Sequence, residues 1–136
     1  MIIDAKHQII GRVATFAAKK ALLGEQVNII NCEQALITGN KSDIVAKYMQ
    51  RIARGQPGQG PYISRRSDFL VKRLLRGMLP YKKTRGKAAL SRIRCYTGTP
   101  EEIKGEAITV KGAEAGKLPN FNYMTIKQLC TLIHRP

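Results

Sequence analysis

The segment from Arg51 to Arg94 constrains this chain more than any other part of the sequence. It carries 13 of the 24 Lys and Arg residues, and Asp68 is its only acidic residue. Apolar residues recur within it at helical spacing, which indicates a folded element that is buried on one side. Positive charge at this density opposes compaction of the free protein, so a folded surface of this kind needs a polyanionic partner. Nucleic acid, contacted mainly through its phosphates, is the partner that we predict.

One helix is predicted inside this segment, beginning at Ser67 or Asp68 and ending before Pro80, which cannot continue a helix. At about 100° per residue, its apolar and basic residues separate onto opposite sides. The apolar side comprises Leu70, Val71, Leu74, Leu75 and Met78. The basic side carries Lys72, Arg73 and Arg76, with Phe69 among them.

The residues from Tyr81 to Lys87 are predicted to form a basic loop. Pro80 and Gly86 disfavour a regular helix there, and the loop contains cations and no acid: Lys82, Lys83, Arg85 and Lys87. Because the charges repel one another and no core contact offsets the entropy of ordering them, we expect the loop to be mobile in the free protein. Binding to RNA phosphates would then order it.

Length and composition indicate a single folded domain over residues 1–136. A chain of 136 residues can bury a modest core, and 43% hydrophobic content is too high for a wholly disordered basic protein, although the formal net charge is +15. No apolar run approaches the roughly 20 residues that span a bilayer. The N-terminus has no secretory signal pattern. We therefore expect an intracellular protein without a membrane partner.

The N-terminal third follows the pattern of a βαβ unit. Met1–Asp4 and Val27–Ile30 are predicted strands, joined by a helix from Arg12 to Leu23 that ends at Gly24. The two strands should be parallel and the crossover right-handed, which places the chain in the α/β class. Residues 35–38 are a candidate strand too close to the previous one for a parallel crossover, and their pairing stays open.

Two further elements flank the basic helix. A helix is predicted from Ser42, as its N-cap, to about Arg54, followed by a Gly- and Pro-rich loop over Gly55–Pro61. A short helix at residues 88–90 should lead into a strand at residues 93–96.

The segment over residues 100–136 is a less regular C-terminal extension. It contains a candidate helical turn at Thr99–Glu102, a candidate extended piece at Ile108–Val110, and a final helix over Ile126–Ile133. Thr125 is the predicted cap of that helix, whose apolar face consists of Ile126, Leu129, Cys130 and Ile133.

The predicted RNA-binding residues are cations suited to phosphate contacts, together with two aromatic residues placed to stack on unpaired bases. A merely solvated basic surface is the weaker interpretation, because no compensating acids accompany the charges. For the aromatic residues, packing against the core stays equally open. The set is Arg12, Lys41, Lys47, Arg51, Arg54, Arg65, Arg66, Phe69, Lys72, Arg73, Arg76, Tyr81, Lys82, Lys83, Arg85, Lys87, Arg92 and Arg94.

No pattern in the sequence indicates catalysis, a cofactor or a metal site. Thr38–Ser42 invites comparison with a phosphate-binding P-loop, but that motif needs Lys directly after its second Gly, and Asn40 intervenes. The three cysteines and two histidines do not have the spacing of a zinc site. We therefore predict three reduced thiols, no catalytic residue, no cofactor and no small-molecule substrate.

Several motifs resemble one known family, the thirteenth ribosomal protein of the large subunit in its archaeal and eukaryotic form. The most specific is Arg76-Gly77-Met78-Leu79-Pro80 followed by Arg85-Gly86-Lys87-Ala88-Ala89-Leu90, and weaker ones occur at Gly11–Ala14, Thr38–Lys41 and Gly60–Tyr62. Together they cover about residues 1 to 100.

The resemblance implies a three-layer α/β/α fold around a small, mostly parallel four-stranded sheet. It also implies a structural protein that binds large-subunit ribosomal RNA, supports assembly and contacts neighbouring ribosomal proteins in the cytoplasmic ribosome. Two alternatives are kept open, a free regulatory protein that binds messenger RNA and an RNA-modifying enzyme.

Overall fold

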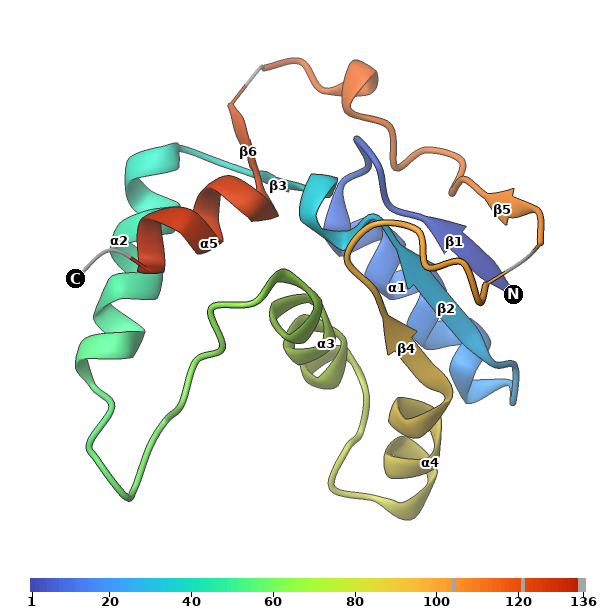
Figure 1. Ribbon diagram of the computed structural model, residues 1–136, viewed down its shortest axis with the longest axis horizontal. Helices are drawn as coiled ribbons and strands as arrows, with labels where there is room; N and C mark the ends of the chain where they lie inside the picture. The colour runs from blue at the N-terminus through green and yellow to red at the C-terminus, as the bar shows by residue number, and fades with distance from the viewer. Residues whose placement is uncertain (104, 121, 135–136) are drawn as a thin grey trace.

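A four-stranded parallel sheet lies at the centre of the computed structural model, which describes residues 1–103, 105–120 and 122–134 (Figure 1). The strand order is β4-β2-β1-β5, and each neighbouring pair is parallel. The strands are β1 (Ile2–Asp4), β2 (Val27–Ile30), β4 (Ile93–Cys95) and β5 (Ala107–Ile108). The predicted α/β class with a small, mostly parallel four-stranded sheet is confirmed.

Helix α1 (Ile10–Leu22) connects β1 to β2 and completes the predicted βαβ unit. It begins two residues before the predicted start at Arg12. Its buried side is rich in alanine, because Ala14, Ala17 and Ala21 are fully buried, and such short side chains let the helix lie close to its neighbours. Gly24 ends the helix as predicted, with a φ of +105° that L side chains rarely adopt.

Helix α3 (Ser67–Met78) packs beside α1, and the two helices share one hydrophobic core with β1 and β2. The core-facing residues of α3 are Leu70, Val71 and Leu75, all buried as predicted. Leu74 is only half-buried, and Met78 is 43% exposed because the last turn of the helix lies at the surface.

The predicted basic loop over Tyr81–Lys87 is wrong from Thr84 onward, because α4 (Thr84–Arg92) begins there. Pro80 ends α3, yet its carbonyl accepts the backbone N–H of Lys83 at 2.9 Å and so helps to start the next helix. Gly86 does not break α4. It is buried within the helix, and a Cβ at this position would lie 2.0 Å from the Pro80 carbonyl oxygen. Because Gly86 has no side chain, the backbone of α4 can lie directly against the backbone of Pro80.

The face of the sheet that lies opposite α1 is crossed by the chain that runs from β4 at one edge to β5 at the other (Figure 1). The predicted helical turn at Thr99–Glu102 is an isolated turn, closed by a 3.1 Å hydrogen bond from Ile103 N–H to the Pro100 carbonyl. Gly105 packs so closely over Ile2 that a Cβ would lie 2.8 Å from its Cδ1 atom. Among the described residues, this layer of the predicted α/β/α arrangement is therefore irregular rather than helical.

Residues 36–38 form β3 (Leu36–Thr38), which pairs antiparallel with β6 (Tyr123–Thr125) in a separate two-stranded sheet. The candidate strand at residues 35–38 thus finds its partner near the other end of the chain. Helix α5 (Ile126–His134) follows β6 directly. Its predicted cap is confirmed, because Thr125 Oγ1 accepts the Gln128 N–H and Gln128 Oε1 accepts the Thr125 N–H, both at 3.2 Å.

Helix α2 (Lys41–Ala53) contacts α5 and has no fully buried residue. Asn40, not Ser42, occupies its N-cap position, so the predicted cap is wrong. The apolar stripe of α2 is half-buried at Ile44 and Tyr48, whereas Met49 is exposed. None of the described helices is long and apolar enough to cross a bilayer.

The backbone contact at Gly86 provides a test of the fold. We expect Gly86→Ala to lower the free energy of unfolding by about 1–3 kcal/mol or more, the cost of forcing an extra carbon into a packed site. Gly77 in α3 is the matched control, because a Cβ there meets no atom within 4 Å. Gly77→Ala should raise stability by about 0.5–1 kcal/mol. Urea denaturation would measure the stability of both variants. Equal unfolding midpoints for the two variants would contradict the close backbone contact at Gly86.

Candidate nucleic-acid interface

Acidic and basic residues occupy different parts of the fold. Four of the nine acidic residues lie in residues 101–114, and all four are exposed: Glu101, Glu102, Glu106 and Glu114. The basic segment instead runs from the end of α2, at the left of Figure 1, through α3 in the centre to α4 at the lower right. The side with α2, α3 and α4 is therefore the stronger candidate for contact with a polyanion.

Half of the predicted RNA-binding residues are exposed and have no internal partner. Within the described part of the chain, their side chains donate no hydrogen bond, form no ion pair and lie over no aromatic ring. They come from α2, the loop after it, the start of α4 and β4. This unpaired basic set consists of Lys41, Lys47, Arg54, Arg65, Lys82, Lys83, Arg85, Lys87 and Arg94.

Two predicted RNA-binding arginines stabilise the fold itself. The guanidinium group of Arg92 donates a 3.2 Å hydrogen bond to the Ala21 carbonyl at the C-terminal end of α1, where a positive charge is also favoured by the helix dipole. Arg12 donates to the Gly112 carbonyl and ties α1 to the chain after β5. Sequence alone did not distinguish these structural arginines from RNA-binding ones, because the carbonyl groups that they contact are distant along the chain.

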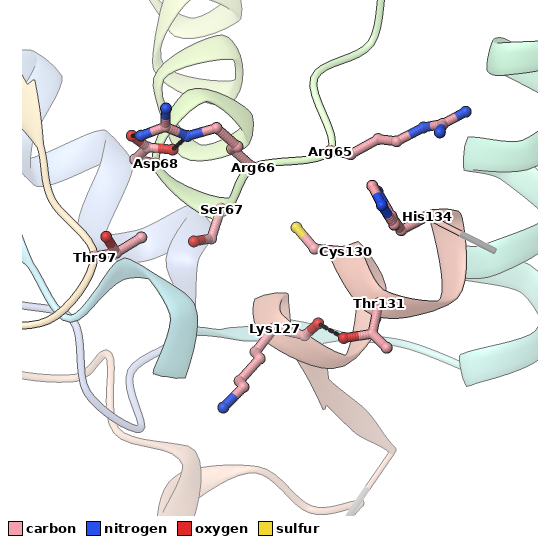
Figure 2. Close-up of a pocket in the computed structure, with 9 residues that line it drawn as sticks. All are labelled: Arg65, Arg66, Ser67, Asp68, Thr97, Lys127, Cys130, Thr131 and His134. Carbon is pink, nitrogen blue, oxygen red and sulfur yellow. Dashed lines mark hydrogen bonds and ion pairs between the residues drawn. The ribbon is translucent and has the colours of Figure 1, made fainter.

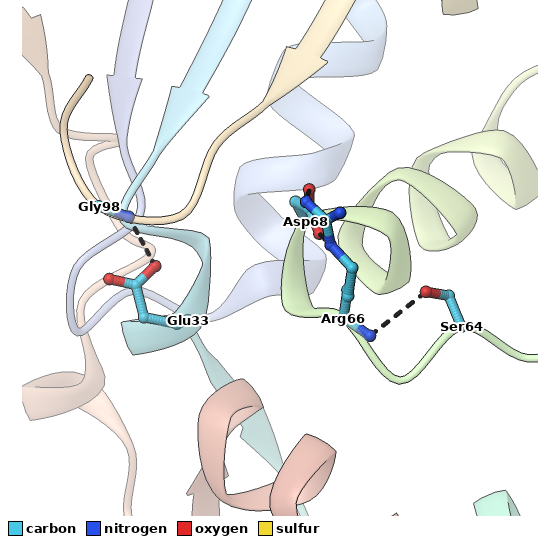
Figure 3. Close-up of polar contacts among 5 residues, drawn as sticks. All are labelled: Glu33, Ser64, Arg66, Asp68 and Gly98. Carbon is cyan, nitrogen blue, oxygen red and sulfur yellow. Dashed lines mark hydrogen bonds and ion pairs between the residues drawn. The ribbon is translucent and has the colours of Figure 1, made fainter. Parts of the chain in front are cut away.

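Arg65 and Arg66 are adjacent in sequence but point in opposite directions (Figure 2). Arg66 forms an ion pair with Asp68, with 2.8 Å between Nη2 and Oδ2, and its backbone N–H donates to Ser64 Oγ at 3.3 Å (Figure 3). Arg66 is thus partly neutralised, whereas Arg65 remains in the unpaired basic set.

The loop between α2 and α3 is attached to α3 by Arg73. Its Nη1 atom donates a 2.6 Å hydrogen bond to the carbonyl oxygen of Tyr62, near the end of the loop. Tyr62 itself is 67% exposed. It was not among the predicted site residues, and its position after a Gly- and Pro-rich stretch was the available signal for an exposed aromatic ring.

Guanidinium groups lie over both predicted stacking residues. The Arg66 guanidinium carbon is 4.9 Å from the ring centroid of Phe69, and that of Arg76 is 4.2 Å from the ring centroid of Tyr81. Phe69 is 50% exposed and Tyr81 is half-buried. Neither ring belongs to the buried core, so the packing interpretation left open from sequence does not describe them. Each ring instead forms a cation–π pair.

A cavity of about 230 Å³ separates α2 from α3, lined in part by Arg51 and Arg73. Tyr48 lines it too and lies under Arg51, with 5.6 Å from the guanidinium carbon to the ring centroid. Burial raises the pKa of the Tyr48 hydroxyl, which keeps it protonated as a hydrogen-bond donor at neutral pH. The cavity therefore combines two cations with a hydroxyl group and can accept a phosphate or the edge of a base.

The comparison with known protein families agrees with the resemblance seen in the sequence. The model of the family described as "Ribosomal protein L13" matches residues 1–102. The chain belongs to the ribosomal protein L13 family.

Similar members of this family come from archaea. The chain is 42% identical over 131 residues to the "Large ribosomal subunit protein uL13" of Methanopyrus kandleri, which covers 94% of the chain and 82% of that relative. It is 44% identical over 126 residues to the protein of the same name from Methanococcoides burtonii, covering 92% and 91%. A third, from Methanosarcina barkeri, is 39% identical over 130 residues, covering 94% and 93%.

The match to the L13 family model ends before β5, β6 and α5. These elements nevertheless belong to the same fold, because β5 pairs with β1 and β6 pairs with β3. Two strands of the C-terminal extension predicted over residues 100–136 are therefore hydrogen-bonded to strands of the N-terminal part of the chain.

The cysteines of this L13 family member are free thiols, with Cys32 buried and the other two half-buried. A hydrogen bond with the Cys95 side chain, together with burial, raises the pKa of Cys32 far above its ordinary value. Among the described residues, no group of three or more His, Cys, Asp and Glu side chains could hold a metal ion.

Arg92, the last residue of α4, and Arg94, in the middle of β4, should respond differently to truncation. We expect Arg92→Ala to lower the free energy of unfolding by about 1–2 kcal/mol, because the Ala21 carbonyl loses a charged donor. Arg94, in the unpaired basic set, is the control, and Arg94→Ala should change stability by less than about 0.5 kcal/mol. Chemical denaturation would measure both. A larger loss for Arg94→Ala would contradict the division into structural and unpaired arginines.

Proposed function

We propose that this protein is a structural component of the large ribosomal subunit, where it binds ribosomal RNA and supports assembly without catalysing a reaction. The observation that carries this proposal is the unpaired basic set on the ordered framework of an L13 family member. The relatives reported above are named as large ribosomal subunit proteins. Their names support the choice of ribosomal RNA over other polyanions.

The charge distribution supports RNA as the partner. A net charge of +15 on 136 residues makes the free protein repel itself, and contacts with phosphates would offset that repulsion while releasing counterions. Arginine, which occurs four times in the unpaired basic set, contacts phosphate oxygens through two parallel donors. Lysines of the same set add point charges that contact phosphates without sequence preference.

The acidic segment over residues 101–114 supports a different kind of contact. Its four exposed carboxylates would repel RNA phosphates. We expect neighbouring large-subunit proteins, not RNA, on this side of the molecule. The proposed location follows from these partners and is the ribosome in the cytoplasm.

Ribosome incorporation can be tested with two variants that change the charge equally. In the first, Lys82, Lys83 and Lys87 are replaced by Glu, and in the control the exposed lysines Lys6, Lys19 and Lys111 are replaced by Glu. On high-salt sucrose gradients, we expect the wild type and the control in the large-subunit peak and the first variant to be depleted from it.

The same gradient separates the proposal from its alternatives. A wild-type protein that remains at the top of the gradient would contradict the ribosomal role and favour a free messenger-RNA-binding protein or an RNA-modifying enzyme. Equal incorporation of both variants would show that the lysines near α4 do not contact RNA.

Salt dependence measures how many phosphates the protein contacts. We expect the slope of log affinity against log salt to be about −4 or steeper, because each contact contributes about −0.7 to −0.9 and we expect at least about six contacts. Filter binding with large-subunit ribosomal RNA at several salt concentrations provides the slope. A value shallower than about −2 would mean that the unpaired basic set lies mostly outside the interface.

A further inference from the structure

A pocket of about 370 Å³ lies where the N-terminus of α3 meets α5 and the chain after β4 (Figure 2). Ser67 lines it from α3, Thr97 from the chain after β4, and Lys127 from α5. These three residues are far apart in sequence. The pocket therefore exists only in the folded chain.

The backbone of α3 offers hydrogen-bond donors at this pocket. Arg66 occupies the N-cap position, and its side chain does not cap the helix. Within the described residues, the backbone N–H groups of Ser67, Asp68 and Phe69 have no hydrogen-bond partner. Unsatisfied N–H groups and the positive end of the helix dipole together attract an anion.

The side chain of Ser67 is a second and independent indication of a ligand. Ser67 is only 8% exposed, and its hydroxyl group makes no hydrogen bond within the part of the chain that the structure describes. Figure 2 shows this hydroxyl directed into the pocket, between Thr97 and Cys130. A side chain this deeply buried usually has a hydrogen-bond partner. The Ser67 hydroxyl has none among the described residues but is open to the pocket, so it is available to a ligand there.

The charges around the pocket favour an anion. Arg65 and Lys127 line it as cations whose charged ends extend away from Ser67 in Figure 2, and its only carboxylate, Asp68, already forms the 2.8 Å ion pair with Arg66. Cys130 stays uncharged at neutral pH, because burial raises the pKa of its thiol. No unpaired negative charge on the described lining residues therefore opposes an anionic ligand.

We propose that this pocket binds a phosphate group, with Ser67 Oγ and the first-turn N–H groups of α3 donating hydrogen bonds and Lys127 supplying charge. Two sources share this chemistry, the RNA backbone and free phosphate, and we assign the pocket to one backbone phosphate. That assignment rests on the function proposed above. It gives α5, which lies beyond the match to the family model, a direct part in RNA binding.

Binding of phosphate itself is tested with inorganic phosphate as the probe. In the ¹⁵N-labelled full chain, we expect saturable shifts of the amide signals of Ser67, Asp68 and Phe69 on titration. Ser67→Ala should weaken this binding by about fivefold, the effect of losing one hydrogen bond. Ser42→Ala is the matched control, because Ser42 is an exposed serine in the first turn of α2 and should leave the binding unchanged.

Binding of RNA forms the second arm of the experiment. We expect Ser67→Ala and Lys127→Gln each to weaken affinity for large-subunit ribosomal RNA at unchanged melting temperature. Lys127→Gln should also reduce the magnitude of the salt slope by about 0.7–0.9, the contribution of one phosphate contact. Lys111→Gln, which changes an exposed lysine in a turn remote from the pocket, is the control for charge.

The two arms distinguish failure of this inference from failure of the proposed function. Wild-type RNA binding without saturable phosphate shifts would overturn the inference and leave the proposed function standing. Phosphate binding with RNA affinity unaffected by both variants would overturn the assignment to an RNA phosphate and assign the pocket to free phosphate. Phosphate binding by a protein that does not bind ribosomal RNA would overturn the proposed function and the assignment to an RNA phosphate, and would leave only the phosphate site standing.

Discussion

The packing of α1 and α3 into one apolar core with the parallel sheet is the interaction on which the rest of the structure depends. The chain carries far more positive than negative charge, so electrostatic repulsion opposes folding. Burial offsets it, because a fully buried Leu or Val side chain contributes about 1.5–3 kcal/mol relative to exposure. Leu70, Val71 and Leu75 provide this stabilisation from α3, against the alanine-rich side of α1 and the isoleucines of the sheet. The core thereby holds the basic segment in an ordered form.

Arginine has two different roles in this molecule. Arg12, Arg73 and Arg92 donate hydrogen bonds to backbone carbonyls and connect segments that are distant along the chain. Others, such as Arg54 and Arg65, are exposed and have no partner among the described residues. The first group sets the positions of helices and loops, and the second group is free to contact the RNA that we propose as the partner. A guanidinium group suits both roles, because it satisfies carbonyl oxygens and phosphate oxygens through the same planar donors.

The C-terminal part of the chain completes both the fold and the pocket that we propose binds phosphate. Strand β6 pairs with β3, and the Thr125 capping box starts α5 immediately afterwards. This sequence of local interactions brings α5 to α2 and places Lys127 opposite the N-terminus of α3. The C-terminal segment therefore has a defined place, because its partners β3 and α2 belong to an earlier part of the chain.

Local patterns in the sequence determined the βαβ unit, the buried side of α3 and the Thr125 cap, since each depends on residues within a few turns of one another. They also determined the family, through motifs such as Arg76–Pro80. Only the tertiary structure decided the pairing of β3, the structural use of Arg92 and the burial of Ser67, because the deciding partners are distant in sequence. Gly86 shows the physical reason most clearly. Its local propensity disfavours a helix, whereas the close approach of the Pro80 backbone, visible only in three dimensions, requires glycine inside one.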